Sequence, residues 1–133
     1  MTRFDAADPA DRRKLFVDAI TAHRTRASPF LTIEVDKETL ESDDPKLDAP
    51  WLQFADGIVN LDCTDAELES LKDLLGEFPA FKIDEITRSD STEGVNVRVS
   101  AKADPNRIAQ FVDATFQRVY DCPDEFRAWV VAV

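Results

Sequence analysis

The stretch that decides the fold is residues 95–119, VNVRVSAKADPNRIAQFVDATFQRV, where a strand pattern runs directly into a helix pattern. Apolar and polar residues alternate over 95–101, which is typical of a strand with one buried face. Asp104 and Pro105 then fit the N-cap and the first position of a helix. The apolar stripe of this helix consists of Ile108, Phe111, Val112, Thr115, Phe116 and Val119. This order predicts a helix packed on one face of a sheet.

A second strand–helix unit lies upstream. Residues 58–62, IVNLD, predict a strand, and Thr64 with Glu67 predicts a capping box that begins a helix. The apolar stripe of this second helix consists of Leu68, Leu71, Leu75 and Phe78. Residues 80–87, AFKIDEIT, predict the next strand, in which a bulge near Asp84 would restore the alternation.

Further elements are predicted at both ends of the chain. Asp8 and Pro9 predict the start of a helix that ends near Arg26, and residues 30–35, FLTIEV, alternate like a strand. The apolar face of the helix consists of Leu15, Phe16, Ala19, Ile20 and His23. Residues 127–133, RAWVVAV, are apolar on both faces. They predict a strand that is covered on both sides or contacts a partner.

The strand order has two competing predictions. From residue 58 the order strand, helix, strand, strand, helix, strand is that of a ferredoxin-like fold. However, Asp56-Gly57 predicts a hairpin that pairs 58–62 with 51–55. In the ferredoxin-like order, a later strand and not 51–55 would lie next to 58–62, so the two predictions cannot both be fully correct. Both predictions share an α+β fold class, a two-layer sandwich with three helices on one face of a mainly antiparallel sheet. The chain is expected to form one domain over 1–133, in which the first helix and strand are an N-terminal extension.

The balance of acidic and basic residues indicates the salt concentration in which the protein works. The chain has 27 acidic and 16 basic residues and a formal net charge of −11, and its acids are mostly Asp while Lys is scarce. Such a surface suits molar salt, where self-repulsion is screened within roughly 3 Å. Bulk acidity disfavours nucleic acid as a partner. The sequence shows no signal peptide and no membrane span, so we expect a cytoplasmic protein that does not contact a membrane.

The whole chain resembles a family of small, uncharacterised acidic cytoplasmic proteins of halophilic archaea. The resemblance is carried by FVDAITAHRTRASPFLTIEVD at 16–36, PWLQFADGIVNLDC at 50–63 and ADPNRIAQFVDATFQRVY at 103–120. It implies a high-salt cytoplasm. It brings no activity, cofactor or catalytic residue.

Two cysteines and one histidine are the candidate reactive groups. Cys63 precedes the cap at Thr64, where the helix dipole can lower a thiol pKa. In a ferredoxin-like order Cys122 would lie at the same end of the sheet, so a redox-responsive pair is one hypothesis, and two small buried residues are the alternative. His23 is interpreted as a packed helix-end residue that helps balance the dipole, or else as a general base.

A local basic surface is the candidate binding site. Asn96, Arg98 and Lys102 are predicted on the outer face of the strand over 95–101, where they would bind an anion or a partner. The plainer interpretation is cross-strand pairing with acidic neighbours. The acidic segment 36–48 matches no calcium-loop pattern, and neither a Gly-rich phosphate loop nor a metal-ligand spacing occurs, so no metal or cofactor is predicted.

The sequence therefore favours a non-catalytic binding or interaction domain. A homodimer is expected to form through the terminal strand or the open face of the sheet. The alternative is a small enzyme or redox-responsive protein that uses Cys63 or His23, with Arg98 binding an anion.

Overall fold

The protein is described by a computed structural model covering residues 3–26, 31–36, 50–88 and 94–132. Its strands in this part of the chain are β1 (Arg3–Ala6), β2 (Leu31–Val35), β3 (Trp51–Ala55), β4 (Ile58–Cys63), β5 (Phe81–Arg88), β6 (Val95–Ala101) and β7 (Ala128–Ala132). Its helices there are α1 (Pro9–Arg26), α2 (Asp65–Leu75) and α3 (Pro105–Ala114), and α3 continues into a π-helical turn, η2 (Thr115–Val119).

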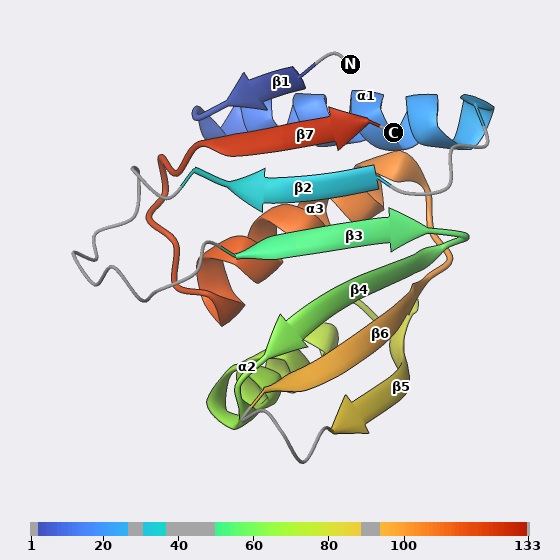
Figure 1. Ribbon diagram of the computed structural model, residues 1–133, viewed down its shortest axis with the longest axis vertical. Coiled ribbons are helices and arrows are strands. Elements are labelled where there is room, and N and C mark those ends of the chain that lie inside the picture. Colours follow the sequence, from blue (N-terminus) through green and yellow to red (C-terminus); the bar gives the residue numbers. More distant parts are fainter. Residues whose placement is uncertain (1–2, 27–30, 37–49, 89–93, 133) are drawn as a thin grey trace.

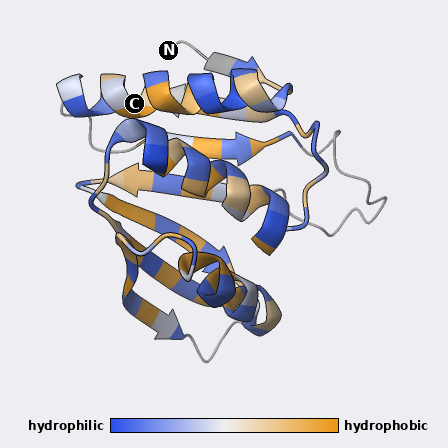
Figure 2. Ribbon diagram, turned by 180° about the vertical axis from the view of Figure 1, so that it is seen from behind, coloured by the Kyte–Doolittle hydropathy of each residue, from blue (hydrophilic) through white to orange (hydrophobic). Residues whose placement is uncertain are grey.

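All seven strands form one antiparallel sheet in the order β1-β7-β2-β3-β4-β6-β5. In Figure 1 this sheet faces the viewer and the helices lie behind it. Seen from behind in Figure 2, α1, α2 and α3 all cover the same face. The predicted α+β class with three helices and an antiparallel sheet is confirmed, and the second face of the sheet carries no helix of the described chain.

The core fills the space between the sheet and the helices. Buried and more exposed residues alternate along β2, β3, β4 and β6, and β6 buries the four apolar residues at 95, 97, 99 and 101. Strand β5 does not alternate, since most of its residues after Phe81 are exposed. Helix α3 and its continuation η2 together bury the whole predicted stripe, from Ile108 to Val119. The predicted bulge is present, since the register between β5 and β6 shifts between Ile83 and Glu85. Burial of these side chains is the main term that stabilises the fold.

The β3–β4 hairpin decides the strand order. Asp56 and Gly57 have φ angles of 51° and 75°, the left-handed pair that a tight hairpin turn requires. This turn places β3 on the side of β4 where a ferredoxin-like fold would place its last strand. The unit β4–α2–β5 with β6 between its strands is present, but β2 and β3 separate β4 from β7. The ferredoxin-like order is therefore not observed.

Strand β7 is paired on both sides within the chain. It lies between β1 and β2, and Val130 pairs with Phe4 and Ile33. The strand is thus hydrogen-bonded along both edges. The prediction concerned its two faces, of which the one toward the helices is covered, since Ala128 and Val130 are buried. Strand β1 was not predicted, because four residues are too few for a periodic pattern.

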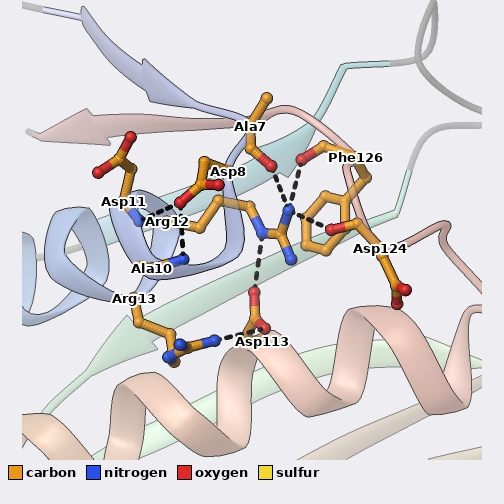
Figure 3. A network of polar contacts seen from close by, with 9 residues as sticks. All are labelled: Ala7, Asp8, Ala10, Asp11, Arg12, Arg13, Asp113, Asp124 and Phe126. Carbon is orange, nitrogen blue, oxygen red and sulfur yellow. Dashed lines mark hydrogen bonds and ion pairs between the residues drawn. The ribbon is translucent and has the colours of Figure 1, made fainter.

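A buried arginine joins the two ends of the chain. Arg12 is fully buried, and its Nε donates to Asp113 Oδ1 of α3 at 2.9 Å. Its Nη1 donates to the carbonyl oxygens of Ala7, Asp124 and Phe126 (Figure 3). The guanidinium also stacks on the Phe126 ring, with 3.9 Å between the guanidinium carbon and the ring centroid. One side chain thus ties α1, α3 and the segment before β7 together.

None of the described helices has the length and apolar character that a membrane crossing requires.

Candidate binding site on the open face of the sheet

The sheet face opposite the helices, which we call the open face, carries a row of polar side chains. Gln53 pairs with Asn60 across β3 and β4, Asn60 pairs with Arg98 across β4 and β6, and Arg98 pairs with Glu85 across β6 and β5. Neighbouring strands lie about 4.8 Å apart, so the row is continuous. A hollow of about 230 Å³ opens over it. Its lining consists of Gln53, Ala55, Asp56, Ile58, Asn60 and Arg98.

An amide relay fixes the orientation of Asn60. The Asn96 Nδ2 donates to Asp62 Oδ1 and to Asn60 Oδ1, each at 2.9 Å. A carboxylate such as Asp62 only accepts, so it selects the amino end of Asn96. That amino group in turn selects the oxygen of Asn60, which leaves the Asn60 amino group to face other partners. The predicted site residue Asn96 therefore does not line the hollow but orients a residue that does.

The guanidinium of Arg98 is the cationic group of the hollow. Its side chain is 55% exposed, and its Nη1 lies 3.9 Å from Glu85 Oε2. This ion pair is the cross-strand pairing that the plainer interpretation predicts, but it is too long for a hydrogen bond. An exposed pair of this kind contributes about 0–1 kcal/mol. Within the described residues the guanidinium donates no hydrogen bond, so its donors remain available.

Lys102 does not join this site. It follows the last residue of β6 and is exposed, and it is not among the residues that line the hollow. Where the strand ends, the period-2 rule that places alternate residues on one face no longer applies.

The two cysteines lie on the helix side of the sheet, not on the open face. Both are buried and free. Burial raises the pKa of Cys63 to about 12, with a further contribution from Glu67, and burial likewise raises the pKa of Cys122 to about 12. For Cys63 the loss of hydration outweighs the helix dipole that was expected to lower the value. The strand adjacency that suggested a cysteine pair is absent, because β7 does not neighbour β4.

His23 also lies on the helix side. It is buried at the end of α1, and its ring packs edge to face on Phe54 with 5.4 Å between centroids. Burial lowers its pKa, and the charge of Arg24 adds to this while Asp56 opposes it. His23 therefore packs against the core as predicted. Because a lowered pKa favours the neutral imidazole, His23 does not balance the helix dipole, and this part of the prediction is corrected.

The sheet itself separates these groups from Arg98. Cys63 and His23 pack under one face and Arg98 lies on the other. The fold therefore does not bring Cys63 or His23 into one site with Arg98, which the enzyme hypothesis requires. Among the described residues no group of His, Cys, Asp or Glu could hold a metal ion. Most of the acidic segment 36–48 lies outside the described residues.

The family of the chain follows from its sequence as a whole. A family model spans residues 1–133. The chain belongs to DUF7975, a family of unknown function. A search of curated proteins and a search of solved structures each found no match.

Sequence reasoning missed most of the lining of the hollow. Gln53, Ile58 and Asn60 were not singled out, although a signal for them exists. A two-residue hairpin loop at Asp56-Gly57 fixes the register and places Asn60 opposite Gln53. Alternation in IVNLD then places Asn60 on the face away from the core.

Proposed function

We propose that this chain is a non-catalytic binding domain that holds a small polar molecule in the hollow on its open face. The observation that carries the proposal is the row Gln53, Asn60 and Arg98 along the hollow. Among the described residues the guanidinium of Arg98 donates no hydrogen bond and has only the long ion pair with Glu85. A concave site with a few convergent polar groups is the usual form of a small-molecule site.

Catalysis is less well supported than binding. A nucleophilic cysteine acts as its thiolate, and burial keeps both thiols protonated at neutral pH. A general base must reach the group that it deprotonates, whereas His23 is packed against an aromatic ring under the opposite sheet face. The hollow itself offers Arg98, two amides and Asp56, a set that suits recognition.

The test is an amide NMR titration with four separate pools of small metabolites: amines, sugars, organic acids and nucleotides. We expect at least one pool to shift the resonances of residues 53, 60 and 98 more than those of helices α1 to α3. The same spectra report the ligand signals over time, so turnover would be visible as new ligand peaks.

Two results would contradict the proposal. One is that no pool at millimolar concentration shifts the hollow. The other is conversion of a pool member together with shifts centred on Cys63 or His23, which would favour the enzyme alternative.

Homodimerisation through the open face is a second candidate, favoured by two tryptophans. Trp51 and Trp129 each pair with Glu34, so the three side chains form a row on the open face. Aromatic residues are enriched in interfaces. The molar mass from light scattering in multimolar salt tests this proposal: a dimer that becomes a monomer in Trp51→Glu supports it, and a strict monomer contradicts it.

We also propose that the protein works in molar salt, as its Asp-rich composition suggests. A net charge of −11 produces self-repulsion that salt screens. The midpoint of thermal unfolding should therefore rise from low to multimolar potassium chloride. A midpoint that is independent of salt would contradict this adaptation.

A further inference from the structure

Building on the proposed function, we propose that the ligand of the hollow is a small organic monocarboxylate with a short alkyl chain. Its carboxylate contacts Arg98 and Asn60, and its alkyl chain lies against Ile58 and Ala55. This assigns the chemical class of the ligand, which the binding function alone leaves open.

The polar groups of the hollow select an anion because they are donors. Arg98 offers a planar fork that matches the two oxygens of a carboxylate. Next to it on β4, Asn60 has its oxygen engaged by Asn96, so the group it can offer is the amino end. Arg98 and Asn60 thus place two donors side by side, an arrangement that suits an oxyanion. Acceptor oxygens of Gln53, Asp56 and Glu85 lie around them, and the four-ligand comparison below measures which of these groups decides the ligand class.

The apolar part of the lining calls for an alkyl chain. Ala55 and Ile58 are directly opposite each other on β3 and β4, and both are half-buried on the open face. They lie on the hairpin side of the polar row, so a ligand held at Arg98 would extend toward them along the strands. The hollow of about 230 Å³ is smaller than the roughly 300–1,000 Å³ of pockets for drug-sized ligands, which limits the chain to a few carbons.

The charged residues around the hollow favour a ligand that carries a single negative charge. Asp56 belongs to the lining, and Glu85 lies 3.9 Å from the guanidinium of Arg98. Each carboxylate repels an anionic ligand, and the repulsion doubles for a phosphate dianion. One arginine therefore suits a carboxylate better than a phosphate monoester.

The experiment compares four ligands of the same chain length: butyrate, butyramide, butylamine and butyl phosphate. Affinities come from the shifts of residues 53, 60 and 98 at constant ionic strength. We expect butyrate to bind most tightly, and Arg98→Gln to weaken it about 10- to 100-fold, the range for hydrogen bonds to a charged group. Asn60→Asp should weaken butyrate as well, because it replaces a donor with an anion of the same size.

Arg88→Gln is the matched control. Arg88 is an exposed arginine of the same sheet that bonds to Asp65 and does not line the hollow. It should leave the affinity for butyrate unchanged, and the dispersion of the amide spectra shows that each variant is folded.

Each other outcome overturns the inference in its own way. If butyramide or butylamine binds in the hollow as tightly as butyrate, the carboxylate assignment is wrong while the binding function stands. If butyl phosphate binds more tightly, the site recognises phosphate. If none of the four ligands and none of the metabolite pools shifts the hollow, the binding function and the ligand class both fail.

Discussion

Replacing Arg12 by methionine should destabilise the protein strongly. Arg12 is fully buried and Asp113 is nearly so, with 7% of its side chain exposed. Methionine keeps much of the apolar stem but removes the donors to Asp113 and to the carbonyl groups of Ala7, Asp124 and Phe126 (Figure 3). The variant therefore leaves a buried carboxylate with a single remote cation, the Arg13 Nη1 at 4.0 Å.

The expected magnitude follows from this geometry. Breaking a buried ion pair by removing one partner costs about 3–5 kcal/mol, because the remaining charge stays desolvated. Stacking of the guanidinium on Phe126 at 3.9 Å adds about 2 kcal/mol when it is desolvated, of which methionine retains a part through contact with the ring. A domain of this size has about 5–15 kcal/mol in total, so the loss is a large fraction of its stability.

The assay is equilibrium unfolding by urea, followed by the fluorescence of the two tryptophans. Arg13→Met is the matched control, since Arg13 is the next residue, contacts the same carboxylate and is 46% exposed. That substitution should cost about 0–1 kcal/mol. The double variant Arg12→Met/Asp113→Leu should be more stable than Arg12→Met alone, because it removes the uncompensated charge.

Equal losses in Arg12→Met and Arg13→Met would refute this reasoning. So would a double variant whose loss is the sum of two single losses, because residues that share a buried pair must show coupling.

Three further predictions concern the helix ends and the buried titratable groups. Thr64→Ala should lower the free energy of unfolding by about 1 kcal/mol, because it removes the acceptor for the Glu67 amide in the capping box; an unchanged urea midpoint would contradict it. The pKa of His23 is lowered in the folded state, so the unfolded state binds its proton more tightly and stability should fall as pH drops below about 6.5. In His23→Leu the urea midpoint should therefore depend less on pH between about pH 7.5 and about pH 5.5. An equally steep pH dependence in this variant would show that His23 is not the group responsible. Cys63 and Cys122, whose pKa values are raised to about 12, should react slowly with a thiol reagent in the native protein and completely after unfolding without reductant; immediate native reaction would speak against burial, and missing thiols after unfolding would favour the redox-pair hypothesis.

The elements of the fold were predictable because local signals specify them. Asp104-Pro105, the capping box at Thr64 and the Asp56-Gly57 turn each act within a few residues, and the structure contains all three. The alternation over 95–101 likewise gave both the strand and its buried face. Signals of this kind depend on nearest neighbours, so a single sequence is sufficient to read them.

The strand order was less predictable because it depends on competition between distant segments. The order of elements after residue 58 favoured a ferredoxin-like sheet, and only the hairpin signal opposed it. The hairpin prevailed, since a two-residue turn closes at little entropic cost whereas a crossover must bring distant strands together. Strand β7 then pairs with β1 and β2 instead.

The Arg12 network shows another limit of sequence reasoning. Arg12 precedes Phe16 by one helical repeat and so lies on the buried stripe of α1, but a charged residue there normally indicates the edge of the stripe. Its burial depends on Asp113, which is 101 positions away in the chain and also falls beside an apolar stripe. Nothing local links the two residues.

The candidate site was predictable in part. Arg98 and Asn96 were placed on the correct face, yet the roles of Gln53, Asn60 and Ile58 depend on the β3–β4 register and on the hydrogen bonds of Asn96. Cys63 and His23 were candidate reactive groups, with packed residues as the alternative interpretation, and the structure buries both under the opposite face.

The central claim is that the hollow on the open face binds a small carboxylate in a defined orientation. Intermolecular nuclear Overhauser effects between butyrate and methyl-labelled protein test it most directly. We predict contacts from the alkyl protons of butyrate to the methyl groups of Ile58 and Ala55. These contacts should disappear in Arg98→Gln and persist in Arg88→Gln. Contacts confined to methyl groups of the helix side, or contacts at Ile58 that do not depend on Arg98, would contradict the account.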